Sequence, residues 1–168
     1  MEIWKEFEAN PLTHSATHYL FAVYDLTQNL GYARVTDVAK KLGIARSSAS
    51  LGLKNLIEKS LIQEDNNKFL RLTQTGKQLT EEIRSKKQIL LRFFQDILKI
   101  DPEQADIDTC KIEHLISLDT SNSLLGFIRY LFSKDLTPKK ALEKFWELKE
   151  KCSGKDNCLL CEKTNLEK

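Results

Sequence analysis

The apolar pattern of this chain changes from helical to alternating spacing after residue 60 and returns to helical spacing after residue 72. Segments 61–64 and 69–72 are typical of two short strands, and the polar residues 65–68 between them are typical of a turn. Three helical segments precede this hairpin. Few folds place one hairpin directly after three helices, and a winged helix-turn-helix is the one we expect.

The boundaries of the first three helices follow from their capping residues. Thr13 is the predicted N-cap of the first helix, which Gly31 ends, and Thr36 is the predicted cap of a short second helix that Gly43 ends. The third helix follows at once and carries Ala49, Leu53, Leu56 and Ile57 on its inner face. A short helix, a glycine-containing turn and a third helix with a polar outer face fit a helix-turn-helix pair.

The rest of the chain is predicted to be helical. Thr73 opens a long amphipathic helix to about Lys99, and Asp101-Pro102-Glu103-Gln104 is a strong helix start. Further helices are expected over 121–132 and, capped by Thr137-Pro138, to about Glu150. The fold class is therefore mainly α. The expected domains are a winged helix-turn-helix over 1–73, a helical domain over 74–136, and a C-terminal helix with a cysteine-rich tail over 137–168.

Composition bounds the class of protein. The chain has 168 residues, of which 41% are hydrophobic and 30% charged, and it has no apolar run long enough for a membrane span. The N-terminus lacks an apolar signal core, so we expect a cytoplasmic protein whose four cysteines are thiols or metal ligands. A formal net charge of +2 permits nucleic-acid binding through a local basic face without requiring it.

The start of the third helix is suited to a surface that lies close to DNA. Serine hydroxyls bond phosphates or base edges, and arginine binds guanine or the backbone. The hairpin would form a wing that touches phosphates. The candidate DNA-binding residues are Arg46, Ser47, Ser48, Ser50, Leu51 and Lys54 on the helix and Asn66, Asn67, Lys68 and Arg71 on the hairpin. Because these residues lie on elements that follow one another as in a winged helix-turn-helix, they predict a protein that binds double-stranded DNA.

Cys110, Glu113 and His114 lie in a predicted helix at positions i, i+3 and i+4, which share one face. A thiol, a carboxylate and an imidazole together are donors that borderline transition metals select. The chain's other two histidines, His14 and His18, are again four residues apart, so one ion could join two distant helices. The plainer alternative is a buried cysteine beside a surface Glu-His pair.

The polar tail carries Cys152, Cys158 and Cys161. A Cys-x-x-Cys pair gives two thiolates a shared grip on one ion, and Cys152 can add a third. We expect a small zinc site or an iron-sulfur cluster there. Exposed thiols without a role are the alternative.

These motifs together resemble the metal-dependent repressors of the diphtheria-toxin-repressor and manganese-transport-regulator type. The resemblance covers roughly residues 12 to 133. The matching stretches are 18–26 in the first helix, 38–43 with Ser47-Ser48 in the helix-turn-helix, 72–76 after the hairpin, and Cys110-Lys111-Ile112-Glu113-His114. The Cys-x-x-Glu-His run is the most specific of them.

The resemblance implies a homodimeric repressor of metal-homeostasis genes that binds a DNA operator when its metal site is filled. It assigns metal binding and dimerisation to the helical domain over 74–136. Carried over by position, the principal site uses His18, Cys110, Glu113 and His114, and His14 can supplement or replace His18. His18 stands where iron sensors of the family have Met and manganese sensors have Asp. Cys110 stands where iron sensors have Cys and manganese sensors have Glu. This set favours Fe(II), whereas Mn(II) suits it poorly and Zn(II), Co(II) and Ni(II) would bind in vitro.

The chain departs from the family in three places. The iron sensors' ancillary site has two histidines and a glutamate, where this chain has Lys87, Leu91 and Asp106, so we expect no second site of that type. Leu51 replaces a base-contacting glutamine, which leaves the operator sequence open. The length leaves no room for the SH3-like third domain of longer members.

Two other functions fit parts of the pattern. A redox-sensing winged-helix regulator would act through its cysteines without a principal metal site. A metallohydrolase would use Cys110, Glu113 and His114 around a catalytic zinc, but the chain lacks a His-x-x-x-His helix with an adjacent general base. We therefore expect a protein that is not an enzyme.

Overall fold

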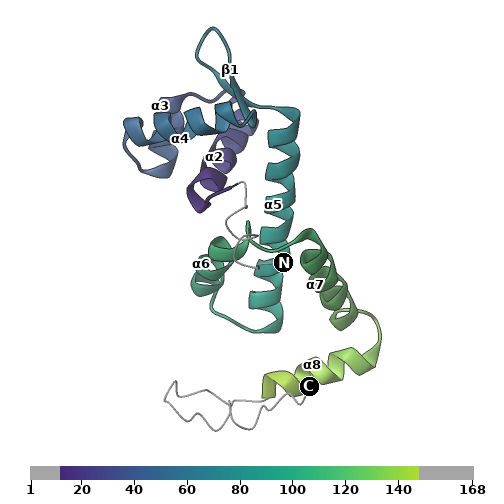
Figure 1. The fold of residues 1–168 in the computed structure, drawn as a ribbon. Helices are drawn as coiled ribbons and strands as arrows, with labels where there is room; N and C mark the ends of the chain where they lie inside the picture. The colour runs from purple at the N-terminus through teal and green to yellow at the C-terminus, as the bar shows by residue number, and fades with distance from the viewer. Residues whose placement is uncertain (1–11, 148–168) are drawn as a thin grey trace, which may run out of the picture. The chain divides into compact units, whose positions relative to one another are not determined.

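The computed structural model describes residues 12–147, and its elements follow one another in the predicted order (Figure 1). They are α2 (His14–Leu30), α3 (Val35–Leu42), α4 (Arg46–Glu58), β1 (Ile62–Glu64), β2 (Leu70–Leu72), α5 (Gln74–Arg92), the π-helical turn η1 (Phe93–Ile97), α6 (Pro102–Ile112), α7 (Leu118–Leu131) and α8 (Leu136–Glu147). The mainly α fold with a winged helix-turn-helix at its start is confirmed.

The chain divides into two compact units, residues 1–126 and 127–168. The first holds the winged helix-turn-helix, α5 and α6. The domain limits predicted at residues 73 and 136 stay predictions. No helix between residues 12 and 147 is long and apolar enough to cross a membrane.

Side-chain caps fix the start of three helices, each where the sequence predicts it. The Thr13 hydroxyl accepts a hydrogen bond from the Ala16 N–H at 3.2 Å, and the Asp101 carboxylate accepts from the next N–H groups of α6. The Thr73 hydroxyl accepts from the Gly76 N–H at 3.0 Å and so begins α5 directly after the hairpin. Each cap satisfies a backbone donor that has no partner within its helix.

Several predicted helix boundaries were wrong, and the helix predicted over 121–132 spans Leu118–Leu131. The second helix begins at Val35 with Arg34 as its N-cap, because Ala33 just before it is held in an antiparallel bridge to Leu70. The long helix does not reach Lys99 as α-helix: it ends at Arg92 and continues as η1. The last helix begins at Leu136, where the Asp135 carboxylate, not Thr137, caps the turn by accepting from the Thr137 N–H at 2.9 Å.

The hairpin is a two-stranded antiparallel sheet in which Ile62 pairs with Leu72 and Glu64 with Leu70. Its turn is closed by the Asp65 carboxylate, which accepts from the Asn67 and Phe69 N–H groups at 2.9 Å each. The backbone N–H of Leu70 also donates to Ala33 at 2.8 Å. This last bond ties the wing to the segment between α2 and α3.

The hydrophobic core of the first unit lies mainly within the winged helix-turn-helix. Its fully buried apolar residues come from α2, α3, α4 and both strands, and they include Leu20, Val23, Val38, Ala49, Leu53, Leu56, Ile62 and Leu70. Helix α5 leads away from the hairpin and α6 folds back beside it (Figure 1). Helix α2 is attached to α5 by an ion pair of 2.6 Å between Asp25 and Arg84. The N-terminal end of α2 thereby faces α6.

Candidate metal centre and DNA-binding face

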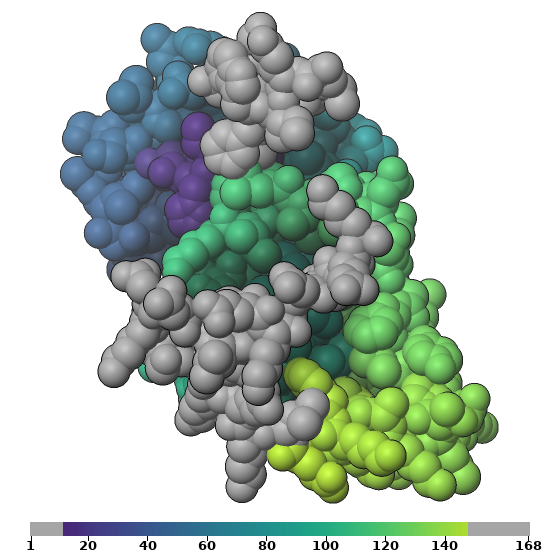
Figure 2. All heavy atoms as spheres, turned by 60° about the horizontal axis from the view of Figure 1, so that its bottom comes forward, coloured from purple at the N-terminus to yellow at the C-terminus, as the bar shows by residue number. Residues whose placement is uncertain are grey.

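Donor atoms from α2 and α6 meet in one cluster. His14 and His18, one turn apart on α2, bring their Nε2 atoms within 3.2 Å of each other. The Sγ of Cys110, in the last turn of α6, lies 3.3 Å from His18 Nε2 and 3.9 Å from His14 Nε2. One ligand atom from each residue lies within 4.8 Å of the others. Figure 2 shows the two contributing segments side by side, with the start of α2 in purple and α6 in green.

The protonation equilibria of His18 and Cys110 are shifted toward their neutral forms. Burial lowers the pKa of His18, and the neighbouring His14 and Lys87 lower it further. Burial raises the pKa of the Cys110 thiol, as do the charges of Glu113 and Asp106, whereas Lys87 opposes them. A neutral imidazole is the form that binds a metal, while the thiol must release its proton.

Glu113 lies in the same region but faces a different partner. It caps the C-terminus of α6, its side chain is fully buried, and neither carboxylate oxygen has a hydrogen-bond partner among the described residues. The Lys87 ammonium on α5 lies 3.9 Å from Glu113 Oε2 and 3.1 Å from Asp106 Oδ1. Burial raises the pKa of the Glu113 carboxyl to about 7, with Lys87 opposing the rise and Asp106 adding to it.

His114 follows the end of α6 and approaches the cluster with its ring. Residues 110–114 were all predicted to be helical, but α6 ends at Ile112. Glu113 is the C-cap of α6 and keeps a helical backbone conformation. The His114 ring centroid lies 5.6 Å from that of His14. Burial lowers the pKa of His114, and both other histidines lower it further.

These residues fit a transition metal. Two imidazole nitrogens and a sulfur converge from two elements, and a buried carboxylate without a hydrogen-bond donor lies on the same helix as the sulfur. A buried carboxylate is costly unless cations or hydrogen-bond donors stabilise it, and the Lys87 ammonium approaches Glu113 only to 3.9 Å. Of the predicted ligands, the structure brings His18 and Cys110 together, adds His14, places His114 beside them, and turns the Glu113 carboxylate toward Lys87.

The predicted DNA-binding residues form an exposed face on α4 and the wing. All ten are exposed, and Leu51, in the middle of the α4 surface, is 65% exposed. A hollow of about 480 Å³ separates the start of α4 from the wing, and Arg34, Thr36, Arg46, Asn67 and Lys68 are among its lining residues. Arg34 and Thr36 were not among the sequence candidates, because their place at this hollow depends on the wing folding back toward α3.

Cys152, Cys158 and Cys161, the predicted tail site, lie outside the described residues.

A winged helix-turn-helix whose first helix shares a cluster of metal donors with a following helical domain defines a metal-responsive DNA-binding protein. Residues 11–68 match the family described as "Iron dependent repressor, N-terminal DNA binding domain". Residues 73–134 match "Iron dependent repressor, metal binding and dimerisation domain". The chain belongs to the iron-dependent repressor family. It is a metal-dependent transcriptional repressor that binds operator DNA as a homodimer, and it is not an enzyme.

Individual relatives agree with this assignment. The HTH-type transcriptional regulator MntR of Bacillus subtilis is 28% identical over 131 residues, which are 78% of this chain and 91% of that protein. The transcriptional regulator MntR of Salmonella typhimurium is 32% identical over 109 residues, covering 65% and 69%. The structure of the manganese regulator SloR shares the fold at a TM-score of 0.64 and 21% identity; the match spans 71% of this chain and 55% of SloR.

Proposed function

We propose that the activating metal of this repressor is Fe(II) and that His14, His18, Cys110, Glu113 and His114 form its site. The observation that carries the proposal is the make-up of the close cluster, in which two imidazoles and a thiol meet without a carboxylate. Thiolate and imidazole donors favour Fe(II), Co(II) and Zn(II), whereas Mn(II) prefers carboxylate and water oxygens.

Each ligand has a distinct part in this site. His14 and His18 supply nitrogen donors from the DNA-binding domain, and Cys110 supplies sulfur from α6. His114 completes the imidazole set from beside His14. Glu113 supplies the one negative oxygen donor by turning from Lys87, and its carboxylate needs a cationic partner in either position because it is fully buried.

The bound ion supplies a link between α2 and α6 that stabilises one orientation of the two domains. Without that link, the attachment of α2 rests on contacts such as the Asp25–Arg84 ion pair. A ligand shifts such an equilibrium only by its differential affinity for the two orientations. Holding α2 on α6 therefore places the two recognition helices of the dimer at the spacing that successive major-groove half-sites require.

The exposed face of α4 is proposed to enter the major groove. Arg46 and Lys54 are its cations, and Ser47, Ser48 and Ser50 offer hydroxyls to phosphates or base edges. Leu51 stands where a polar side chain would read a base edge, and its apolar surface suits the methyl group of thymine. Arg34 and Arg46 at the hollow beside the wing suit a DNA phosphate, whereas Lys68 at the same hollow pairs with Glu64 at 2.8 Å.

The likeness to the manganese regulator SloR makes manganese the competing metal. The test is a metal competition with a ligand swap. Anaerobic wild-type protein and the Cys110→Glu variant would each be titrated with Fe(II) and with Mn(II). The readout is binding of a DNA duplex that the metal-loaded wild-type protein has selected from a random pool.

Wild-type protein is expected to respond at least about tenfold more sensitively to Fe(II) than to Mn(II), and the carboxylate in Cys110→Glu is expected to reverse or abolish that preference. Leu30→Glu, which adds the same carboxylate at the exposed C-terminal end of α2, is the matched control and should leave the preference unchanged. A wild-type protein that responds better to Mn(II) than to Fe(II) would contradict the proposed metal.

A further inference from the structure

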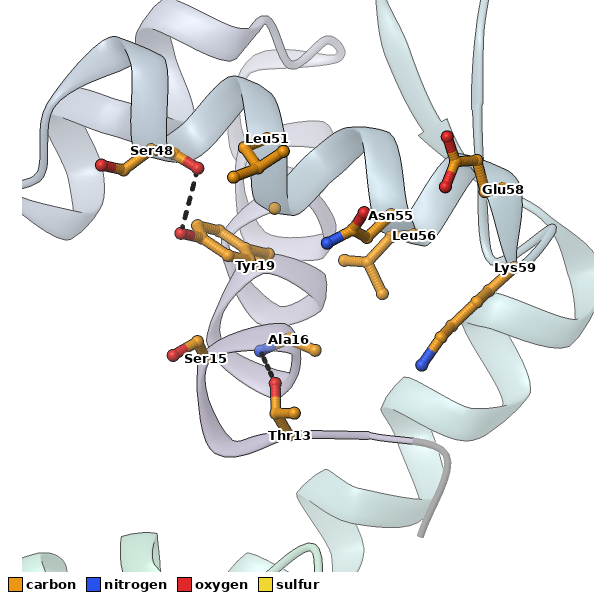
Figure 3. A pocket seen from close by; sticks show the side chains of 11 residues that line it. Thr13, Ser15, Ala16, Tyr19, Ser48, Leu51, Asn55, Leu56, Glu58 and Lys59 are labelled. Atoms are coloured by element: carbon orange, nitrogen blue, oxygen red, sulfur yellow. Dashed lines mark hydrogen bonds between the residues drawn. The ribbon is translucent and has the colours of Figure 1, made fainter. Parts of the chain in front are cut away.

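The residue next to the proposed ligand His18 contacts the recognition helix directly. Tyr19 lies under α4 with its hydroxyl pointing toward Ser48, and the two oxygens are 3.4 Å apart in a hydrogen bond to the Ser48 backbone carbonyl (Figure 3). The contact therefore connects the exposed DNA-binding segment of α4 to the helix that carries both α2 histidines.

Gly52 is what allows the Tyr19 ring to lie so close to α4. A Cβ atom at position 52 would lie 2.6 Å from Cζ and 2.8 Å from Cδ2 of the ring. Glycine in the middle of a helix is unfavourable relative to alanine. At position 52, the missing side chain leaves the space that the Tyr19 ring occupies. Without a side chain at position 52, the ring packs against the helix backbone itself.

The ring is confined on the α4 side and open on the other. A hollow of about 530 Å³ adjoins it, and Thr13, Ser15, Ala16, Leu51, Asn55 and Lys59 are among its lining residues (Figure 3). Because space is available beside the ring, a small shift of the N-terminal end of α2 can move Tyr19 off Gly52 while Leu20 and Val23 stay in the core. The contact is therefore sensitive to the position of α2.

We infer that Tyr19, seated on Gly52, is the positioning residue that transmits the state of the metal centre to the recognition helix. The inference rests on the proposed function. The metal site fixes α2 relative to α6 through His18, and Tyr19 fixes α4 relative to α2. His18 and Tyr19 are adjacent residues of α2. Their two contacts together therefore determine where α4 lies relative to the dimerisation domain.

The test is a double-mutant cycle on the coupling between metal and DNA. Operator affinity is measured with and without Co(II), the probe metal, for the wild type, Tyr19→Ala, Gly52→Ala and the double variant. Co(II) absorption spectra give the metal affinity of each protein separately. Both single variants are expected to bind Co(II) as the wild type does, while the Co(II)-induced gain in DNA affinity falls by about tenfold.

Contacting residues are expected to be non-additive. Gly52→Ala should therefore cause no further loss in the Tyr19→Ala background, because the ring that its methyl group would displace is gone. Tyr19→Phe, which keeps the ring, should retain most of the gain. Leu30→Ala, at the exposed end of α2, is the control and should behave as the wild type.

Hydrogen exchange of the α4 amides gives a readout without DNA. Co(II) should increase protection over residues 46–58 in the wild type and not in Tyr19→Ala. A wild-type protein whose DNA binding does not respond to metal would contradict the proposed function as well. The Tyr19 inference alone would be overturned if the wild type responds to Co(II) and Tyr19→Ala shows the same Co(II)-induced gain in DNA affinity and the same protection of α4.

Discussion

The Sγ atom of Cys110 lies 3.3 Å from Nε2 of His18, although 92 positions separate the two residues in the chain. One atom belongs to the first helix of the DNA-binding domain and the other to α6. This approach is what makes the centre a link between domains, because donors on a single helix would bind a metal without holding anything else in place.

His14 is predicted to be a working ligand. Its Nε2 lies close enough to that of His18 for both nitrogens to bind one ion. Loss of a group that only supports a ligand commonly lowers metal affinity by about tenfold or more, so His14→Ala, which removes a ligand itself, should lower it by at least about tenfold. His18→Ala should lose more, because His18 is nearer to Cys110. Isothermal titration with Co(II) measures both. An unchanged affinity in His14→Ala would remove it from the site.

The stability of the metal-free protein is predicted to carry a pH signature of Glu113. Its pKa of about 7 in the folded protein lies above the ordinary 4.5, so the folded state holds more protons than the unfolded state between these values. Stability contributed by the protonated carboxyl is complete below about pH 4.5 and is lost as the pH rises through about 7. The loss is ~2–3 kcal/mol.

Glu113→Gln isolates this effect, because glutamine keeps the shape and cannot ionise. Relative to the wild type, the variant should gain free energy of unfolding as the pH rises from 5 to 8, measured by urea denaturation with chelator present. His18 and His114, whose lowered pKa values give the opposite slope, are present in both proteins and cancel in the difference. Parallel pH profiles for the two proteins would contradict the prediction.

Lys87 is predicted to limit the centre to one ion. Its ammonium already lies between the carboxylates of Asp106 and Glu113, where a second cation would otherwise bind. Lys87→His exchanges that charge for a metal-binding imidazole and should raise the metal content from one ion per protomer toward two. The assay uses elemental analysis in a background of Cys152, Cys158 and Cys161→Ser, which removes any metal bound by the tail.

Lys77→His, on the same helix beside Glu81, is the matched control and should leave the count at one. A second ion in the Lys77→His protein as well would mean that any added histidine suffices. Comparing the parent chain with its serine background also tests the tail, since equal metal content in the two would eliminate a tail site.

The dimer is predicted to depend on the exposed aromatic residues of α7. Phe127 is 48% exposed and Tyr130 is 54% exposed, and both lie within the matched dimerisation domain. Replacing both with glutamate buries charge in the two-fold interface and should give a monomer by light scattering at micromolar concentration. Lys139→Glu, an exposed charge reversal on α8, should leave the dimer intact. A dimeric Phe127→Glu, Tyr130→Glu protein would place the interface elsewhere.

Local signals predicted much of the fold. The Thr13 and Asp101 caps, the glycine stops at Gly31 and Gly43, and the change of period at the hairpin each depend on a few neighbouring residues. The errors have non-local causes. Helix α3 begins before Thr36 because a bridge from Ala33 to β2 sets its start, and no pattern near residue 36 reveals that bridge.

The sequence predicted which residues make up the candidate site better than it predicted how they are arranged. The spacing of Cys110, Glu113 and His114 suggested one shared face, yet the Glu113 carboxylate turns to Lys87 on another helix while Cys110 turns to α2. The contact of Tyr19 with Gly52 left no signal beyond a glycine inside a helix. Which side chains meet depends on how helices pack, and that information is spread over the whole core.

The most direct test of the central claim is DNA binding by the anaerobically purified, metal-free protein before and after Fe(II) is added. The account predicts weak binding of the selected duplex without metal, at least about tenfold tighter binding with Fe(II), and reversal by a chelator. It also predicts that Cys110→Ser, folded by circular dichroism, loses this response. Equal DNA affinity with and without Fe(II) in the wild type, or an unchanged response in Cys110→Ser, would contradict it.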